Sequence, residues 1–213
     1  LEIEAGKSEL EEKPIGILEL STLFLQSRDF GNSVSLMRKN YNKLKTKLTS
    51  PYVDYFYYLA FPYGYKEIIS RYSNQNNLDP LFVLAVIREE SSFKADAVSF
   101  AGATGLMQII PSTANSIARQ LGITNFSESM LLEPETNIKM GTFYLRQMLN
   151  NFENNKYLAL GAYNGGPGAM KKWVSSWGNM DIDEFIETIP YDETRNYIKK
   201  VMGSYYLYQF LYH

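Results

Sequence analysis

Apolar residues recur every three or four positions along most of the chain, and this spacing predicts helices. A helix is expected to begin at Pro80, and another to begin at Pro111 and end before Gly122. The other predicted helices span residues 16–27, 33–48, 66–72, 134–152, 156–163, 169–176 and 193–210, and an irregular turn is expected at residues 164–168. No alternating strand pattern lasts more than a few residues, and Val98–Thr104 is the best place for a small β excursion. We therefore predict an all-α fold, or α with at most a minor β-hairpin.

Breaks in this helical pattern indicate that the chain is divided into two parts. Residues 1–14 are acidic and polar and are interpreted as a frayed end or the tail of a preceding helix, with breaks at Pro14 and Gly31. Pro62-Tyr63-Gly64 marks the predicted boundary between an N-terminal helical segment, 1–64, and a main domain, 65–213. The aromatic cluster at 52–59 in the N-terminal segment is either a carbohydrate platform or packing against the main domain.

The helix that begins at Pro80 carries the most informative carboxylate. Asp79 is a good N-cap for it. Glu90 falls in the middle of an apolar face, whereas Arg88 points to the opposite side and Glu89 sits on the flank. That apolar face comprises Phe82, Val83, Val86, Ile87 and Phe93. Burial raises the pKa of a carboxyl group, which suits a general acid near neutral pH. The alternative is that Glu90 lies at the helix end and reaches solvent.

The loop after this helix is bracketed by Gly102 and Gly105, which permit backbone conformations that let a ligand approach closely. Several polar residues lie here among apolar neighbours, and each taken alone is also typical of an ordinary loop or cap. They are Ser99, Thr104, Gln108 and Thr113.

Composition narrows the function classes. With 213 residues and 45% hydrophobic residues, the chain is large enough for one good-sized domain, or one domain plus a smaller appendage. A net charge of −2 argues against nucleic acid. The chain lacks cysteine, and its single histidine is His213, so a histidine triad or zinc site is not expected. It shows no secretory apolar region and no run of 18 apolar residues, and from its start at Leu1 we expect a processed product or a fragment of something longer.

Five motifs, in order along the chain, resemble those of the soluble lytic transglycosylase domain, which has a goose-lysozyme-like fold. The resemblance covers about residue 65 to the end. The motifs are Glu90-Ser91-Ser92-Phe93, Gly102-Ala103-Thr104-Gly105-Leu106-Met107-Gln108, Pro111-Ser112-Thr113-Ala114, Ala162-Tyr163-Asn164-Gly165-Gly166-Pro167-Gly168, and Glu193-Thr194-Arg195 with Tyr197.

The resemblance implies cleavage of the β-1,4 bond between N-acetylmuramic acid and N-acetylglucosamine in peptidoglycan. Glu90 would be the single acid and then base, assisted by the substrate acetamido group, and a 1,6-anhydro ring would form without metal or cofactor. The residues implied to contact substrate are Ser99, Gln108, Ile110, Thr113, Tyr163 and Glu193. Ile110 and Lys94-Ala95 depart from the family pattern, which often has Met and Asn-Pro there.

Some of these residues have ordinary structural interpretations. Tyr163 is alternatively a core tyrosine, and Glu193 a first-turn carboxylate that interacts with the helix dipole. Glycoside cleavage commonly uses two carboxylates. Glu89 lies on another helix face and is not expected to share the site readily, and Asp96 is possible but sits in the loop, so nothing local demands a second carboxylate.

Two other functions stay open: a goose-type lysozyme-like hydrolase on the same fold, and a peptidoglycan-binding module without catalysis. The resemblance also implies peptidoglycan glycan strands as the partner, a periplasmic location and a monomer without stable membrane insertion. It further suggests that the N-terminal segment, 1–64, is the remnant of a longer helical array.

Overall fold

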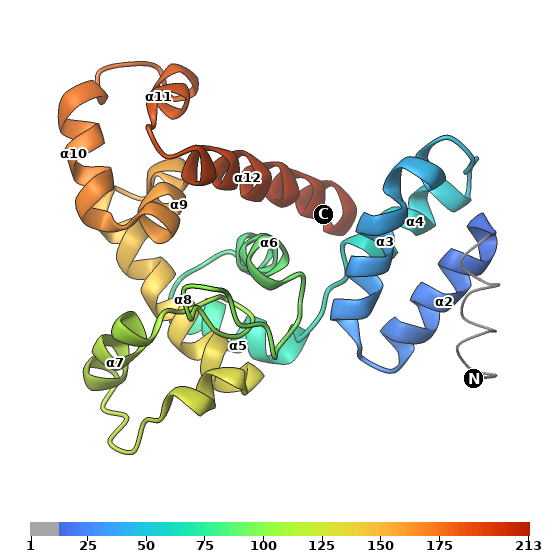
Figure 1. Ribbon diagram of the computed structural model, residues 1–213, viewed down its shortest axis with the longest axis horizontal. Coiled ribbons are helices and arrows are strands. Elements are labelled where there is room, and N and C mark those ends of the chain that lie inside the picture. Colours follow the sequence, from blue (N-terminus) through green and yellow to red (C-terminus); the bar gives the residue numbers. More distant parts are fainter. Residues whose placement is uncertain (1–12) are drawn as a thin grey trace.

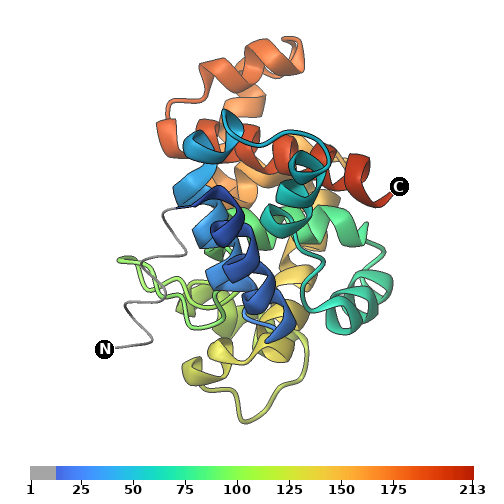
Figure 2. The same ribbon diagram turned by 90° about the vertical axis from the view of Figure 1, so that its right-hand side faces the viewer.

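The computed structural model describes residues 13–213 and is built almost entirely from helices (Figures 1 and 2). In chain order the elements are α2 (Pro14–Gln26), α3 (Phe30–Lys45), α4 (Tyr52–Ala60), α5 (Lys66–Gln75), α6 (Pro80–Ser91), α7 (Pro111–Gln120), the 3-10 helix η1 (Glu128–Leu132), α8 (Pro134–Asn151), α9 (Lys156–Gly165), α10 (Pro167–Trp177), α11 (Ile182–Thr188) and α12 (Asp192–Tyr212). The predicted all-α class is confirmed.

Three details of the predicted pattern are wrong. Pro14 is the first residue of α2 rather than a break, as its fixed φ allows. Gly31 lies inside α3, where a Cβ would come within 2.8 Å of the Lys94 side chain, so a close helix–loop contact explains this glycine. The expected irregular turn at residues 164–168 shrinks to Gly166, with φ of 89°, because α9 runs through Gly165 and α10 starts at Pro167. The prediction for residues 1–14 falls mostly outside the described residues.

Helix α6 is the centre of the fold. Every residue from Leu81 to Ile87 is at most 5% exposed, so the helix is buried all round rather than on one face. The Asp79 side chain accepts a hydrogen bond from the Leu81 amide at 2.8 Å and another from the Tyr205 hydroxyl at 2.6 Å. The cap of α6 is thereby tied to α12, which packs against α6 and crosses it (Figure 1).

The N-terminal helices pack against the end of α12 and the start of the main domain. The Tyr208 hydroxyl donates to the Pro62 carbonyl at 3.2 Å, and the Tyr212 hydroxyl donates to the Phe61 carbonyl at 2.8 Å. In α4, Phe56 is buried, and no residue of 52–59 lines the cavity that contains Glu90. Packing therefore accounts for Phe56 and Leu59, whereas Tyr52, Tyr55 and Tyr58 are exposed. A carbohydrate platform formed by these tyrosines and the division at residue 64 both stay predictions.

The loop between α6 and α7 forms the small β excursion that the sequence predicts. Thr104 makes antiparallel bridges with both Val98 and Ile109. Asn137 of α8 is fully buried beneath this loop and forms three hydrogen bonds: its Oδ1 accepts from the Met107 amide at 2.7 Å, and its Nδ2 donates to the carbonyls of Thr104 at 2.9 Å and Leu131 at 2.8 Å. The Asn137 side chain therefore forms hydrogen bonds with backbone groups of this loop that a longer β-hairpin would pair through its own backbone.

Within residues 13–213, no helix combines the length and the apolar character needed to cross a bilayer.

Candidate active site

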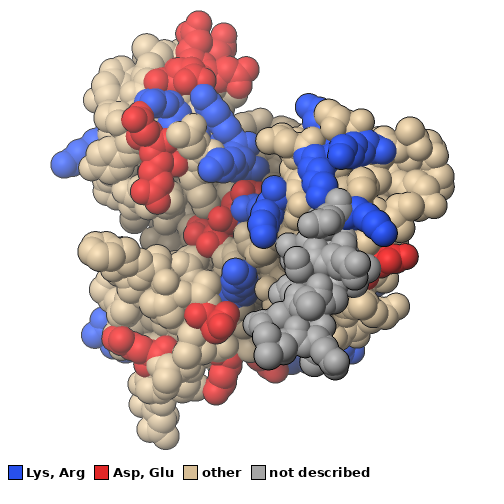
Figure 3. All heavy atoms as spheres, turned by 45° about the vertical axis from the view of Figure 1, so that its right-hand side comes forward, with Lys and Arg blue, Asp and Glu red and all other residues tan. Residues whose placement is uncertain are grey.

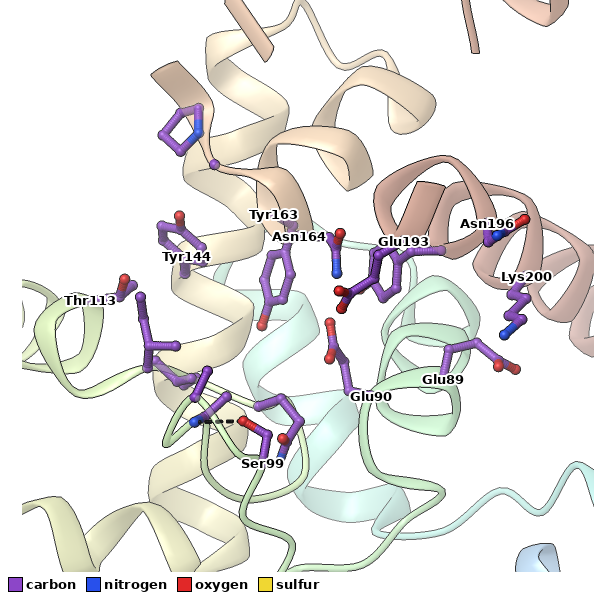
Figure 4. Close-up of a pocket in the computed structure, with 18 of the residues that line it drawn as sticks. Glu89, Glu90, Ser99, Thr113, Tyr144, Tyr163, Asn164, Glu193, Asn196 and Lys200 are labelled. Carbon is purple, nitrogen blue, oxygen red and sulfur yellow. Dashed lines mark hydrogen bonds between the residues drawn. The ribbon is translucent and has the colours of Figure 1, made fainter. Parts of the chain in front are cut away.

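A cavity of about 710 Å³ opens where α6, α9 and α12 meet the loop before α7 (Figure 4). In the space-filling view, acidic atoms lie in a hollow with Lys and Arg side chains beside it (Figure 3). All seven residues that the sequence predicts for the site line this cavity: Glu90, Ser99, Gln108, Ile110, Thr113, Tyr163 and Glu193. Their roles remain predictions.

Glu90 lies in the last turn of α6, next to the helix end at Ser91. It is partly buried, and its carboxylate points into the cavity toward Tyr163 and Glu193 (Figure 4). Burial raises its pKa from 4.5 to about 8, and the negative charges of Glu193 and Glu89 act in the same direction. At neutral pH this carboxyl group therefore holds its proton. The alternative in which Glu90 simply reaches solvent is wrong.

Helix α12 supplies the groups that face Glu90 from the other side. Glu193 lies in its first turn, and Tyr197 follows one turn later, so both project from one face of the helix. The Tyr197 hydroxyl is buried and makes no regular hydrogen bond within the described residues. It lies close enough to Glu90 to lower the pKa of that carboxyl group.

Tyr163 comes from α9 and is fixed by its hydroxyl, which donates to the Met107 carbonyl at 2.8 Å. Its ring contacts that of Tyr144 at a centroid distance of 5.2 Å. Burial, with the nearby Glu90, raises the pKa of the Tyr163 phenol well above its usual value. Because the proton is engaged by a backbone carbonyl, the oxygen lone pairs of Tyr163 remain as an acceptor toward the cavity.

Gln108 and Ser99 line the cavity and also form hydrogen bonds within the loop between α6 and α7. The Gln108 side-chain amide donates to the carbonyls of Ala97 at 3.1 Å and Gly105 at 2.9 Å, while its backbone takes a φ of 47°. The Ser99 hydroxyl accepts from the Ala103 amide at 3.0 Å (Figure 4). These bonds hold the turn so that its polar edge faces the space above Glu90.

Ile110 and Thr113 lie farther along the same wall. Ile110 is the residue before α7 and is 42% exposed, and Thr113 sits in the first turn of that helix. Figure 4 places Thr113 near Tyr144 and away from Glu90. The position is suited to contact with a sugar unit at a distance from the reacting bond.

Glu89 lines the same cavity, although its place on another helix face led us to expect that it could not readily share the site. Its carboxylate, however, points away from that of Glu90 (Figure 4) and pairs with Arg38 at 2.9 Å and Arg88 at 2.5 Å. Asp96 is exposed and does not line the cavity.

Sequence reasoning missed several lining residues. Tyr197, Asn196 and Lys200 share a face of α12 with Glu193 at helical spacing, so this spacing was an available signal. Arg38 has no such signal, since it lies on a different helix far away in the sequence. Among residues 13–213, no three His, Cys, Asp or Glu side chains are grouped closely enough to hold a metal ion.

Comparison with known proteins gives this geometry a context. Residues 67–186 match the family model of the Transglycosylase SLT domain. The soluble lytic murein transglycosylase of Salmonella typhimurium is 39% identical over 150 residues, which cover 68% of this chain and 23% of that protein. The protein of the same description from Escherichia coli K12 is 39% identical over 152 residues, 70% of this chain and 24% of that protein. The chain thus spans about a quarter of the length of these relatives.

Solved structures agree with this match. The 70 kDa soluble lytic transglycosylase of E. coli superposes with a TM-score of 0.81 and 30% identity, over 93% of this chain and 31% of that one. An inactive mutant of lytic transglycosylase Slt from Pseudomonas aeruginosa superposes with a TM-score of 0.77 and 30% identity, over 93% and 30%. The family model covers more than half of the residues, and they fold as these neighbours do: the chain belongs to the Transglycosylase SLT domain family.

Proposed function

We propose that this chain is a peptidoglycan lytic transglycosylase with Glu90 as its acid and base. The single observation that carries this proposal is a carboxyl group with a pKa of about 8 that points into the cavity of a domain of this family. Relatives with the same fold are lytic murein transglycosylases. The P. aeruginosa relative was solved as an inactive mutant with glutamine in place of a glutamate, so that protein requires a glutamate.

In the first step, neutral Glu90 donates its proton to the oxygen between N-acetylmuramic acid and N-acetylglucosamine. The carbon–oxygen bond breaks, and the N-acetylglucosamine side leaves as an alcohol. The acetamido carbonyl of the muramic acid attacks the anomeric carbon and holds the positive charge. The Tyr163 oxygen, whose own proton goes to the Met107 carbonyl, is suited to accept the acetamido N–H.

In the second step, ionised Glu90 takes the proton of the sugar's own 6-hydroxyl. That oxygen attacks the anomeric carbon and closes the 1,6-anhydro ring, while the acetamido group is released. Glu90 ends protonated, as it began, and no water is consumed. A carboxylate in a partly dry cavity is a stronger base than one in water, which favours this return of the proton.

Glu193 gives a specific reason to consider hydrolysis as the second candidate. It places a further carboxylate in the same cavity, facing Glu90 (Figure 4), and a hydrolase would use such a group to activate water. The first interpretation has more support, because relatives that are 39% identical are described as soluble lytic murein transglycosylases, whereas a protonated Glu90 would serve either reaction.

Mass spectrometry of digested sacculi distinguishes these functions. A transglycosylase releases 1,6-anhydromuropeptides, whereas a hydrolase releases reducing-end products heavier by one water. Glu90→Gln should abolish release of either, and Glu193→Gln should slow release without changing the product. Reducing ends from the wild type would favour the hydrolase, and binding to sacculi without soluble fragments would favour a non-catalytic binding module.

The setting of the enzyme is part of the same proposal. Its partner is the glycan strand of peptidoglycan, which places the protein in the cell envelope, and we propose the periplasm and a monomer. We also propose that residues 1–64 are a helical segment distinct from the catalytic domain at 65–213.

A further inference from the structure

An arginine of the N-terminal helices reaches the cavity of the main domain. Arg38 lies on α3, and its Nη2 donates to the Arg88 carbonyl at 3.0 Å and pairs with Glu89 Oε2 at 2.9 Å. The Arg88 carbonyl also accepts from the Ser92 amide at 3.1 Å, where α6 ends. The guanidinium thus contacts the backbone and the side chain of the two residues that precede Glu90. A cation at a helix C-terminus also interacts favourably with the helix dipole.

Glu89 is held between three donors. Its Oε1 accepts from Arg88 Nη1 at 2.5 Å and from the Ser204 hydroxyl at 2.6 Å, which leaves Oε2 to Arg38. The Glu89 side chain is 7% exposed, and that of Arg38 is 37% exposed.

Arg88 is itself fixed. Its Nε donates to the Ala60 carbonyl at 3.1 Å, and its guanidinium lies 3.7 Å from the centre of the Phe61 ring. Of the two cations beside Glu89, Arg38 is therefore the one supplied by a different helix and open at one side to the cavity.

The charge of Glu89 matters to its neighbour. Glu89 and Glu193 both raise the pKa of Glu90, Tyr197 lowers it, and Tyr163 faces the same carboxyl group from α9. Lys200 of α12 lines the same cavity. Arg38 pairs with the first of these carboxylates and so holds it turned away from Glu90.

We propose that Arg38 is a positioning residue for Glu90: it secures the last turn of α6 and holds the Glu89 carboxylate turned away from the reacting centre. This inference rests on the proposed function only in that it takes Glu90 as the acid. It implies that α3, one of the N-terminal helices, influences Glu90 through the Arg38–Glu89 ion pair as well as packing against the main domain.

Carboxyl ¹³C NMR of glutamate-labelled protein tests the inference without any substrate. The Glu90 signal is assigned by its loss in Glu90→Gln, and its titration midpoint is compared among variants. Arg38→Met should raise this midpoint by roughly half a pH unit, the size expected for a partly exposed ion pair. Glu89→Gln should lower the midpoint. Arg38→Met added to Glu89→Gln should then shift it much less than in the wild type, because Arg38 acts through Glu89.

Two further variants separate charge from folding. Arg38→Lys keeps the cation and should hold the midpoint near that of the wild type. Arg38→Gln keeps a donor for the Arg88 carbonyl without the charge, and it replaces Arg38→Met if that variant does not fold. Arg119→Met, on the exposed side of α7, is the matched control and should leave the midpoint unchanged.

The outcomes are distinct. An unchanged Glu90 midpoint in Arg38→Met and Arg38→Gln overturns the inference, and so does a shift that persists in full beside Glu89→Gln. A lowered melting temperature with no shift in the midpoint would show a merely structural role. If wild-type protein releases no anhydromuropeptides from sacculi, the proposed function fails, whereas the titration result stands independently.

Discussion

Replacing Glu90 with glutamine should stabilise the protein at neutral and alkaline pH. Folded Glu90 has a pKa of about 8, whereas an unfolded glutamate has a pKa near 4.3. Below the unfolded value both states hold the proton, so Glu90 then costs no stability. As the pH rises between the two values, only the unfolded chain loses its proton, and stability falls until the folded carboxyl group also ionises.

The size of this loss follows from the separation of the two pKa values. A gap of roughly 3.5 units at about 1.4 kcal/mol per unit corresponds to about 5 kcal/mol, and partial exposure of Glu90 reduces it to about 3–5 kcal/mol. Glutamine has the same shape and does not titrate. We therefore expect Glu90→Gln and wild type to match near pH 4 and to diverge by about 3–5 kcal/mol near pH 8. For a chain of this size, that is a difference in melting temperature of roughly 10 °C.

Urea unfolding followed by circular dichroism, repeated from pH 4 to pH 9, measures this difference directly. Other groups titrate alike in both proteins and cancel in the subtraction. Glu19→Gln, at an exposed position of α2, is the control and should give a flat difference curve. A flat curve for Glu90→Gln would refute the claim that Glu90 is protonated at neutral pH because it is buried.

Three further predictions concern the walls of the site. Asn137→Ala leaves the Met107 amide and the Leu131 carbonyl without a partner, while the Thr104 carbonyl keeps its bond from the Ile109 amide. The substitution should lower the free energy of unfolding by about 2–5 kcal/mol in urea titrations, compared with less than about 1 kcal/mol for the exposed Asn115→Ala. Gly105→Ala puts a Cβ 2.2 Å from Asn137 Nδ2 at a φ of 81° and should lower the melting temperature by several degrees or prevent folding; a wild-type melting temperature would contradict the tight contact. Glu193→Gln removes a negative charge that raises the pKa of Glu90, so the alkaline limb of the pH–rate profile should move to lower pH, and an unmoved limb would show that the two carboxylates do not interact.

Much of the fold was predictable because its signals are local. Helical spacing, Asp79 before Pro80 and Pro111 before the next apolar run depend only on neighbouring residues, and α6 and α7 begin at those prolines. The short α11 and η1 were not predicted, since neither is long enough to show periodicity. Gly31 was misinterpreted because its small size serves a contact with Lys94, which the spacing of α3 does not reveal.

Some features of the candidate site could likewise be predicted from local sequence, and others depend on the fold. The motifs were enough to identify Glu90, Gln108, Tyr163 and Glu193 as candidates, and the structure brings all four to one cavity. The protonation state of Glu90 could not be predicted from the motifs, because its pKa depends on burial and on charges brought in by α12. The pairing of Glu89 with Arg38, a residue of another helix, likewise depends on the fold. The physical reason is that solvation and Coulomb energies depend on distances through space, which the order of residues along the chain does not specify.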